Sequence, residues 1–312
     1  MKAPTDEVLR FAAYHLDAGA HRVWIYLDAP DRDAYDTLDA HPKCTVIDCD
    51  EDYWRRIFGR RPHRHQVRQA NNATRTHARA GDVDWLMHLD VDEFLVSPRS
   101  VGEILQDLPE TALTARVRPI ELLASETFNG GKMAFKAPVP AGPQAHDTLR
   151  GLYPTYGDHI AGGFLSHLEG KVFIRSDCQN ATLHIHNAFS GDDRNPGEVA
   201  LNQMSLAHLH ATDWKNWQDH FEYRLAKGAY RPDLAPTRPA EQGGITLHAF
   251  FKSLIEQSGT TGLRAFFDEV CADTPALRKR LQDQRLLRLL DLQLDAKLHH
   301  HFPDYRPLAA TV

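Results

Sequence analysis

Three acidic side chains gather at the end of a short apolar run in the first third of the chain. The stretch 85–89 (WLMHL) is followed at once by Asp90, Asp92 and Glu93. It lacks the polar alternation of a half-exposed strand, so we predict a buried strand in the centre of a parallel sheet. Open parallel sheets bind ligands beyond the carboxyl ends of their strands. Residues i and i+2 of a strand share a face, so Asp90 and Asp92 are expected to point into one crevice. Hard carboxylate oxygens there suit a Mn²⁺ or Mg²⁺ ion that also holds substrate phosphates.

Other classes that begin with Asp-x-Asp fit the sequence less well. A calcium-binding loop continues with further acids and a glycine at fixed offsets, where this chain has Phe94 and Leu95. A dehalogenase-type phosphatase has Thr or Val two residues past the second aspartate, and Phe94 stands at that position. An Asp-x-Asp pair also often does no more than cap a loop or a helix.

The string Asp84–Leu95 (DWLMHLDVDEFL) resembles the Asp-x-Asp region of the GT-A glycosyltransferases. It is most similar to a bacterial family-2-like group that reads Asp-Trp, an apolar strand and then Asp-Val-Asp-Glu-Phe. The resemblance covers roughly residues 3–230. It implies transfer of a sugar from a UDP- or GDP-linked donor to a glycan or lipid-linked acceptor, with Mn²⁺ or Mg²⁺ bridging the donor phosphates.

The resemblance also implies roles for individual side chains. Asp92 is the expected metal ligand, with His186 next. Asp90 is expected to bind ribose or an ordered water, or to join the metal ligands. If the reaction inverts the sugar configuration, an acid must deprotonate the acceptor, and Glu169 is the candidate. Glu93 is expected to orient the loop.

Five further side chains are expected to contact the nucleotide or its phosphates. Asp28 ends an earlier predicted strand. Gln69 and Asn72 share one helical face at i and i+3, beside the base or ribose. The segment Gly-Lys-x-Phe-x-Arg resembles the family's phosphate-facing piece, so Lys171 and Arg175 are expected to neutralise phosphate charge.

The elements before the acidic stretch alternate in type. Apolar spacing predicts a helix over 5–18, a strand over 23–27, a helix from residue 31 and a strand over 45–47. This order predicts an α/β fold of the GT-A type, with a mostly parallel sheet flanked by helices. Relatives place a strand before the first helix, whereas only four residues precede it here, so we expect the native start to lie upstream.

The chain is expected to divide into a catalytic domain (1–230), a linker rich in Pro and Gly (231–245) and a helical C-terminal extension (246–312). The last predicted helix, from residue 276 to about 298, carries too many leucines for one narrow stripe. It is expected to pack on the main domain or to pair with a second subunit. A peripheral membrane contact is left open.

Composition limits the class of protein. The 312 residues carry a net charge of −6, which argues against a nucleic-acid partner despite the arginines between 55 and 79. No apolar run reaches the length of a transmembrane helix and no leader peptide is recognisable, so a cytoplasmic protein is expected. Two alternatives to a glycosyltransferase are left open: a nucleotidyltransferase of the same fold, and a module that binds a nucleotide, sugar or metal without catalysis.

Overall fold

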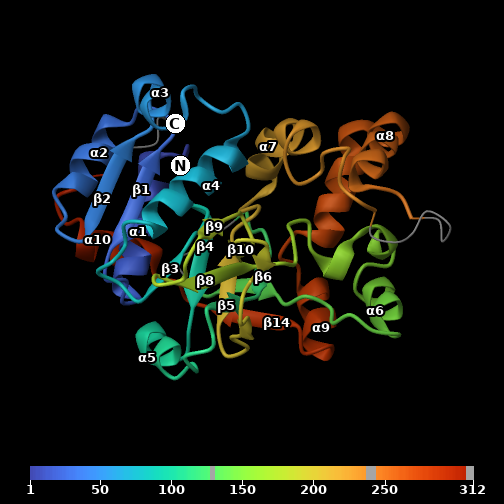
Figure 1. Ribbon diagram of the computed structural model, residues 1–312. Coiled ribbons are helices and arrows are strands. Elements are labelled where there is room, and N and C mark those ends of the chain that lie inside the picture. Colours follow the sequence, from blue (N-terminus) through green and yellow to red (C-terminus); the bar gives the residue numbers. More distant parts are fainter. Residues whose placement is uncertain (127–130, 237–243, 307–312) are drawn as a thin grey trace. The chain divides into compact units, whose positions relative to one another are not determined.

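The computed structural model describes residues 1–126, 131–236 and 244–306 (Figure 1). The chain forms two compact units that are interleaved along the sequence. Unit 1 comprises Met1–Arg118, Glu169–Leu206 and Gln293–Val312, and unit 2 comprises Pro119–Leu168 and Ala207–Leu292. The expected boundaries near residues 231–245 do not coincide with these units, and part of the expected linker lies outside the described residues.

Unit 1 begins with the predicted alternation of helices and strands. Its first elements are α1 (Thr5–Asp17), β1 (Val23–Leu27), α2 (Arg32–Asp39) and β2 (Cys44–Asp48), and β1 pairs with β2 in parallel. The apolar stripe of α1 and the inward face of β1 form one core. Leu298 and Phe302, from the region of α10 (Leu294–His301), complete that core, so the C-terminal segment belongs to unit 1.

The rest of unit 1 supplies the candidate site. Two helices follow β2, α3 (Glu51–Phe58) and α4 (His65–His77), and α5 lies at Val101–Gln106. The strands are β3 (Trp85–Met87), β4 (Glu93–Val96), β5 (Thr114–Val117), β8 (Lys171–Arg175), β9 (Ala181–Leu183), β10 (Ala188–Ser190), β11 (Asp193–Arg194) and β12 (Val199–Ala200). A further strand, β13 (Ser205–His208), begins in unit 1 and ends in unit 2.

The predicted surroundings of the acidic stretch are wrong in one respect. The strand exists, as β3, but its partner β8 runs antiparallel to it. In the strand order β12-β5-β8-β3, β3 comes last rather than at the centre. The apolar sequence of β3 therefore indicates only that the strand is buried. The same sequence pattern is expected for a strand covered by packed side chains and for a central strand of a parallel sheet. The α/β class is confirmed, whereas a mostly parallel sheet is not, because β5–β8 and β6–β7 are antiparallel as well.

Unit 2 joins a small antiparallel sheet to a helical core. Its strands are β6 (Pro119–Leu122), β7 (Met133–Lys136) and β14 (Leu287–Leu290), and its helices are α6 (Ala145–Leu152), α7 (Trp214–Ala226), α8 (Leu247–Val270) and α9 (Pro275–Asp283). Short 3₁₀ turns, η1 (Gly157–His159) and η2 (Ala161–Gly163), follow α6. An aromatic cluster that includes Trp217, Phe251 and Phe266 fills the core.

The single long helix expected over 276–298 is wrong. Helix α9 ends before Arg285, and α10 starts after Gln293; both residues have positive φ, 59° and 51°. Between them β14 pairs antiparallel with β7. The extension is therefore not wholly helical, because the leucine-rich run satisfies its backbone in a sheet. Within the described parts of the chain, no helix is both long and apolar enough to cross a membrane.

Candidate active site

Asp90 lies three residues beyond the end of β3, and both of its carboxylate oxygens accept hydrogen bonds. Gln69 Nε2 donates to Oδ1 at 2.5 Å, and Lys171 Nζ donates to Oδ2 at 2.7 Å. The Asp90 backbone N–H donates to Glu93 Oε2 at 2.8 Å, and Lys171 Nζ also lies 3.2 Å from that oxygen. Side chains from α4, from the loop after β3 and from β8 therefore meet at one carboxylate. Asp90, Glu93 and Lys171, with Gln69, are called the Asp90 cluster below.

Lys171 is the electrostatic centre of the Asp90 cluster. Its side chain is 1% exposed, and that of Glu93 is also 1% exposed. Burial by itself would lower the pKa of Lys171, but the two carboxylates of Asp90 and Glu93 outweigh burial and raise the pKa above its ordinary value. The ammonium group therefore stays charged. One positive charge against two negative charges leaves the cluster with an excess of one negative charge.

Asp28 lies directly after β1 and is held by two arginines. Arg68 donates through Nε at 2.9 Å and through a second nitrogen at 2.7 Å, and Arg61 donates at 3.0 Å. Arg68 and Gln69 are neighbours on α4, so one helix reaches both Asp28 and Asp90. The expected contact of Asp28 with the nucleotide stays a prediction.

Asn72 is engaged elsewhere. It is buried one turn further along α4, where its Oδ1 accepts from the hydroxyl of Tyr53 at 2.6 Å. Its amide nitrogen lies 3.6 Å from Cys49 Sγ. Both ends of the Asn72 side chain therefore bind protein groups, and its expected contact with a base or ribose stays a prediction.

His186 lies beside the segment that carries Lys171. Its Nδ1 is 3.1 Å from the carbonyl oxygen of Gly170. A carbonyl only accepts, so Nδ1 carries the proton and Nε2 carries the lone pair. Burial, reinforced by the nearby charge of Lys171, lowers the pKa of His186 to about 4. The imidazole is therefore neutral near pH 7, which is the state that binds metal ions.

Gly170 is required by this arrangement. Its φ is +71°, and a Cβ built on it would lie 2.0 Å from the carbonyl oxygen of Val117. Only glycine allows the backbone to turn so close to β5 and then to send Lys171 into the Asp90 cluster. The glycine noted in the Gly-Lys-x-Phe-x-Arg segment is thus explained by a steric contact.

Arg116, on β5, organises the turn that precedes Lys171. Its side chain is 2% exposed and binds Glu198 through two hydrogen bonds of 2.9 and 2.8 Å. It also donates to the backbone oxygens of Glu169 (2.9 Å) and His186 (3.0 Å), and to Asn187 Oδ1 (3.0 Å). All five guanidinium N–H groups thus have acceptors. Sequence reasoning missed Arg116, although a charged residue within an apolar strand was a usable signal.

Glu169 is half-exposed, with 52% of its side-chain surface accessible. Its carboxylate Oε2 lies 3.8 Å from Arg116, 4.0 Å from Arg118 and 4.0 Å from Arg194. These are ion-pair distances outside hydrogen-bond range. Glu169 thus has solvent access and lies two residues before Lys171.

Arg175 lies at the opposite end of β8 from Lys171. It pairs with Trp85, the first residue of β3, while Asp90 lies three residues beyond Met87, the last residue of that strand. Four strand residues span roughly 13 Å. The Arg175 guanidinium donates to the carbonyl of Ala112 at 2.9 Å and covers the Trp85 ring at 4.5 Å. Lys171 and Arg175 thus bind protein groups at opposite ends of β8, and their expected role in neutralising phosphate charge stays a prediction.

The metal ligands expected from the sequence, Asp90, Asp92 and His186, stay a prediction. Asp92 is half-buried in the loop beyond β3, between Asp90 and Glu93. Within residues 1–126, 131–236 and 244–306, no group of three or more His, Cys, Asp or Glu side chains is arranged to hold a metal ion. The Asp90 oxygens already bind Gln69 and Lys171. A carboxylate such as that of Asp92 and a neutral imidazole such as that of His186 are both groups that bind divalent cations.

His208, the alternative histidine, belongs to unit 2. It is buried there with His167 and His210, at ring-centroid distances of 6.1 and 5.4 Å. Burial, with the positive charge of Arg224, holds the pKa of His210 well below its ordinary value.

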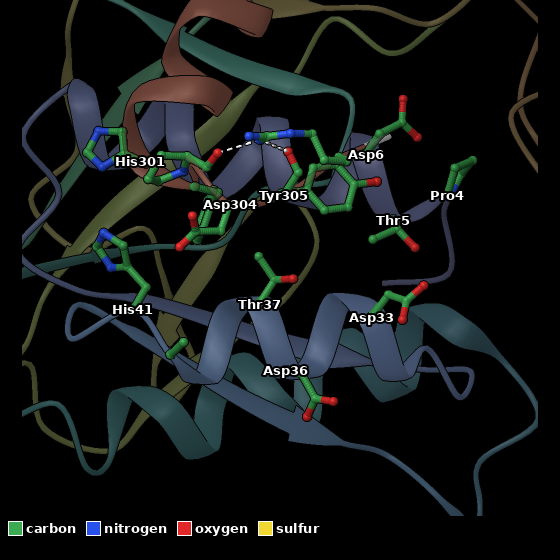
Figure 2. A pocket seen from close by; sticks show the side chains of 14 residues that line it. Pro4, Thr5, Asp6, Asp33, Asp36, Thr37, His41, His301, Asp304 and Tyr305 are labelled. Carbon is green, nitrogen blue, oxygen red and sulfur yellow. Dashed lines mark hydrogen bonds between the residues drawn. The ribbon is translucent and has the colours of Figure 1, made fainter. Parts of the chain in front are cut away.

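A separate cavity of about 930 Å³ lies in unit 1, away from these residues. It is bounded by the start of α1, by α2 and by residues 301–306 (Figure 2). The view shows Asp33 near Thr5, and His301 with His41 toward the other end. None of the expected site residues lines this cavity, and it is not the site of the chemistry described above.

Comparison with known families assigns a class to this arrangement. Residues 2–233 match the model of Glycosyltransferase family 92, so the protein is a glycosyltransferase. Because the match covers well over half of the chain, the protein belongs to glycosyltransferase family 92. No curated protein matches the chain, and no solved structure does. The expectation of a glycosyltransferase is confirmed, while membership of the family-2-like group stays a prediction.

Proposed function

We propose that this glycosyltransferase uses a nucleoside diphosphate sugar, UDP- or GDP-linked, as its donor and a hydroxyl group of a glycan or lipid-linked molecule as its acceptor. The main support for this donor is that α4 links Asp28, after β1, with Asp90, after β3. The adjacent residues Arg68 and Gln69 make these two contacts. Carboxylates suit ribose hydroxyls, and arginine suits phosphate. We take the architecture to be of the GT-A type and the enzyme to act in the cytoplasm.

Charge balance argues for a divalent cation at the leaving group. The Lys171 ammonium is already outnumbered by Asp90 and Glu93, so the Asp90 cluster offers no net positive charge to a departing diphosphate. We propose that Asp92 and His186 hold Mn²⁺ or Mg²⁺ at the edge of this cluster, with donor oxygens completing the ligand set. When bound, the ion supplies the charge neutralisation that glycosidic bond cleavage requires.

The side chains of the protein would do the remaining work. Gln69 and Lys171 orient the Asp90 carboxylate, which we propose accepts a hydrogen bond from the donor ribose. Glu169 is proposed to take the proton from the acceptor hydroxyl, because its carboxylate is half-exposed and lies two residues before Lys171. This role requires inversion of the sugar configuration.

Incubation with labelled UDP- and GDP-sugars and Mn²⁺ tests the proposal. We expect slow release of free sugar with water as acceptor, and its loss on addition of a chelator. Glu169→Gln should lower transfer by about a hundredfold or more, the usual contribution of a general base. Glu51→Gln, at an exposed position on α3, is the matched control. Binding of nucleotide sugars without hydrolysis or transfer under any condition would contradict the proposal.

A further inference from the structure

Three guanidinium groups converge on Glu169 from different strands and turns. Arg116 belongs to β5, Arg118 follows it, and Arg194 belongs to β11. Each lies 3.8 to 4.0 Å from the same carboxylate oxygen. Arg116 is buried, whereas Arg118 and Arg194 are 55% and 56% exposed. The solvent-facing side of Glu169 is therefore flanked by two accessible guanidinium groups, called the Arg118–Arg194 pair below.

Arg116 holds the scaffold of this group. Its hydrogen bonds go to Glu198, to Asn187 and to two backbone oxygens, and these bonds occupy its N–H groups. Arg194 also donates to Asn187 Oδ1 at 3.1 Å. Arg118 donates to the Glu169 backbone oxygen at 3.2 Å. Shared acceptors thus keep the three arginines close together.

The charges of this group do not cancel. Three guanidinium groups face two carboxylates, those of Glu169 and Glu198, and Glu198 is taken up by two hydrogen bonds from Arg116. The carboxylate of Glu169 is outside hydrogen-bond distance of all three arginines. Planar forks of this kind bind carboxylate and phosphate groups through paired hydrogen bonds.

The position relative to the Asp90 cluster restricts what can bind. Glu169 is joined to Lys171 through Gly170 alone, and Arg116 holds the backbone of both Glu169 and His186. A molecule on the Arg118–Arg194 pair would lie next to the proposed base, on the side where an acceptor must approach. The donor, in contrast, is proposed to bind at Asp28 and Asp90, which are held by Arg68 and Gln69 of α4.

We infer that the Arg118–Arg194 pair recognises an acidic group on the acceptor, a sugar carboxylate or a phosphate ester, and so directs the enzyme to anionic acceptors. This inference rests on the proposed function, because it needs Glu169 to face the acceptor. The anion makes charge-assisted hydrogen bonds with both guanidinium groups and brings the neighbouring hydroxyl to Glu169.

Calorimetric titration with two trisaccharides tests the inference. Trigalacturonate is the acidic probe and maltotriose the neutral one. We expect the native protein to bind trigalacturonate at least about tenfold more tightly than maltotriose. The double variant Arg118→Gln/Arg194→Gln should lose this preference, while UDP binding with Mn²⁺ stays at the native level. The double variant Arg32→Gln/Arg55→Gln removes two exposed arginines from helices α2 and α3 and is the charge-matched control.

Three results would overturn the inference. Equal binding of both trisaccharides by the native protein would show no preference for an anion. An unchanged preference in the Arg118→Gln/Arg194→Gln variant, or an equal loss in the control variant, would place the anion elsewhere. Loss of UDP binding in the Arg118→Gln/Arg194→Gln variant would assign these two arginines to the donor phosphates. Failure of the proposed function would appear separately, as no turnover of any nucleotide sugar.

Discussion

Replacement of Lys171 by methionine is expected to destabilise unit 1 strongly. The substitution shortens the side chain by one atom and removes its charge. Glu93, 1% exposed, loses an ammonium group at 3.2 Å, and Asp90 loses one at 2.7 Å. Breaking a buried ion pair from one side costs about 3–5 kcal/mol, because the remaining charge is left uncompensated. Asp90 is 29% exposed and keeps Gln69, so the lower end, about 3 kcal/mol, is the expected loss.

Urea unfolding followed by circular dichroism measures this loss. The comparison is Lys215→Met on α7, which removes an ammonium that is 80% exposed and paired with Asp219; its expected cost is small, because solvent screens the pair. Adding Glu93→Gln to Lys171→Met should recover part of the stability, because the uncompensated carboxylate is gone. A loss below about 1 kcal/mol for Lys171→Met would refute the reasoning, since it would mean that the Asp90 cluster is solvated.

Three further outcomes are expected. Gly170→Ala should lower the free energy of unfolding by about 1–3 kcal/mol or more, which thermal unfolding measures. Alanine is strained at φ +71°, and its Cβ would lie 2.0 Å from the carbonyl oxygen of Val117. Asp92→Ala should abolish Mn²⁺-dependent UDP binding in a calorimetric titration and leave the circular dichroism spectrum unchanged. The native protein should lose stability as the pH falls from about 6.5 to about 4, in part because burial lowers the pKa of His15 to about 4.

The sign of the pH effect follows from proton binding. In this window the unfolded chain protonates His15 and the folded state does not, so lowering the pH favours unfolding, by up to roughly 3 kcal/mol for this group. Urea unfolding of His15→Gln at pH 7 and at pH 4.5 should show a smaller difference than the native protein. Equal differences would remove His15 from the explanation. Likewise, native-like stability of Gly170→Ala, or native UDP affinity of Asp92→Ala, would contradict those expectations.

Local signals in the sequence were sufficient for the helix over 5–17 and the strands beside it, because their apolar spacing reports burial directly. The position of Asp90 at the end of a buried strand was predicted for the same reason. The string around it also led to the correct class of enzyme, through the resemblance of Asp84–Leu95 to the Asp-x-Asp region of known glycosyltransferases. These features lie within a dozen residues of one another, where periodicity and spacing carry information.

The tertiary structure alone decided which groups meet Asp90. Lys171 is 81 residues away from it, and their contact depends on the antiparallel pairing of β3 with β8, which an apolar run does not specify. The same pairing carries Arg175 to the far end of the strand, although it is only four residues from Lys171. Contacts of this kind arise from chain reversal and side-chain packing over long sequence separations. Local pattern can therefore indicate which residues carry chemistry, but it does not determine their partners.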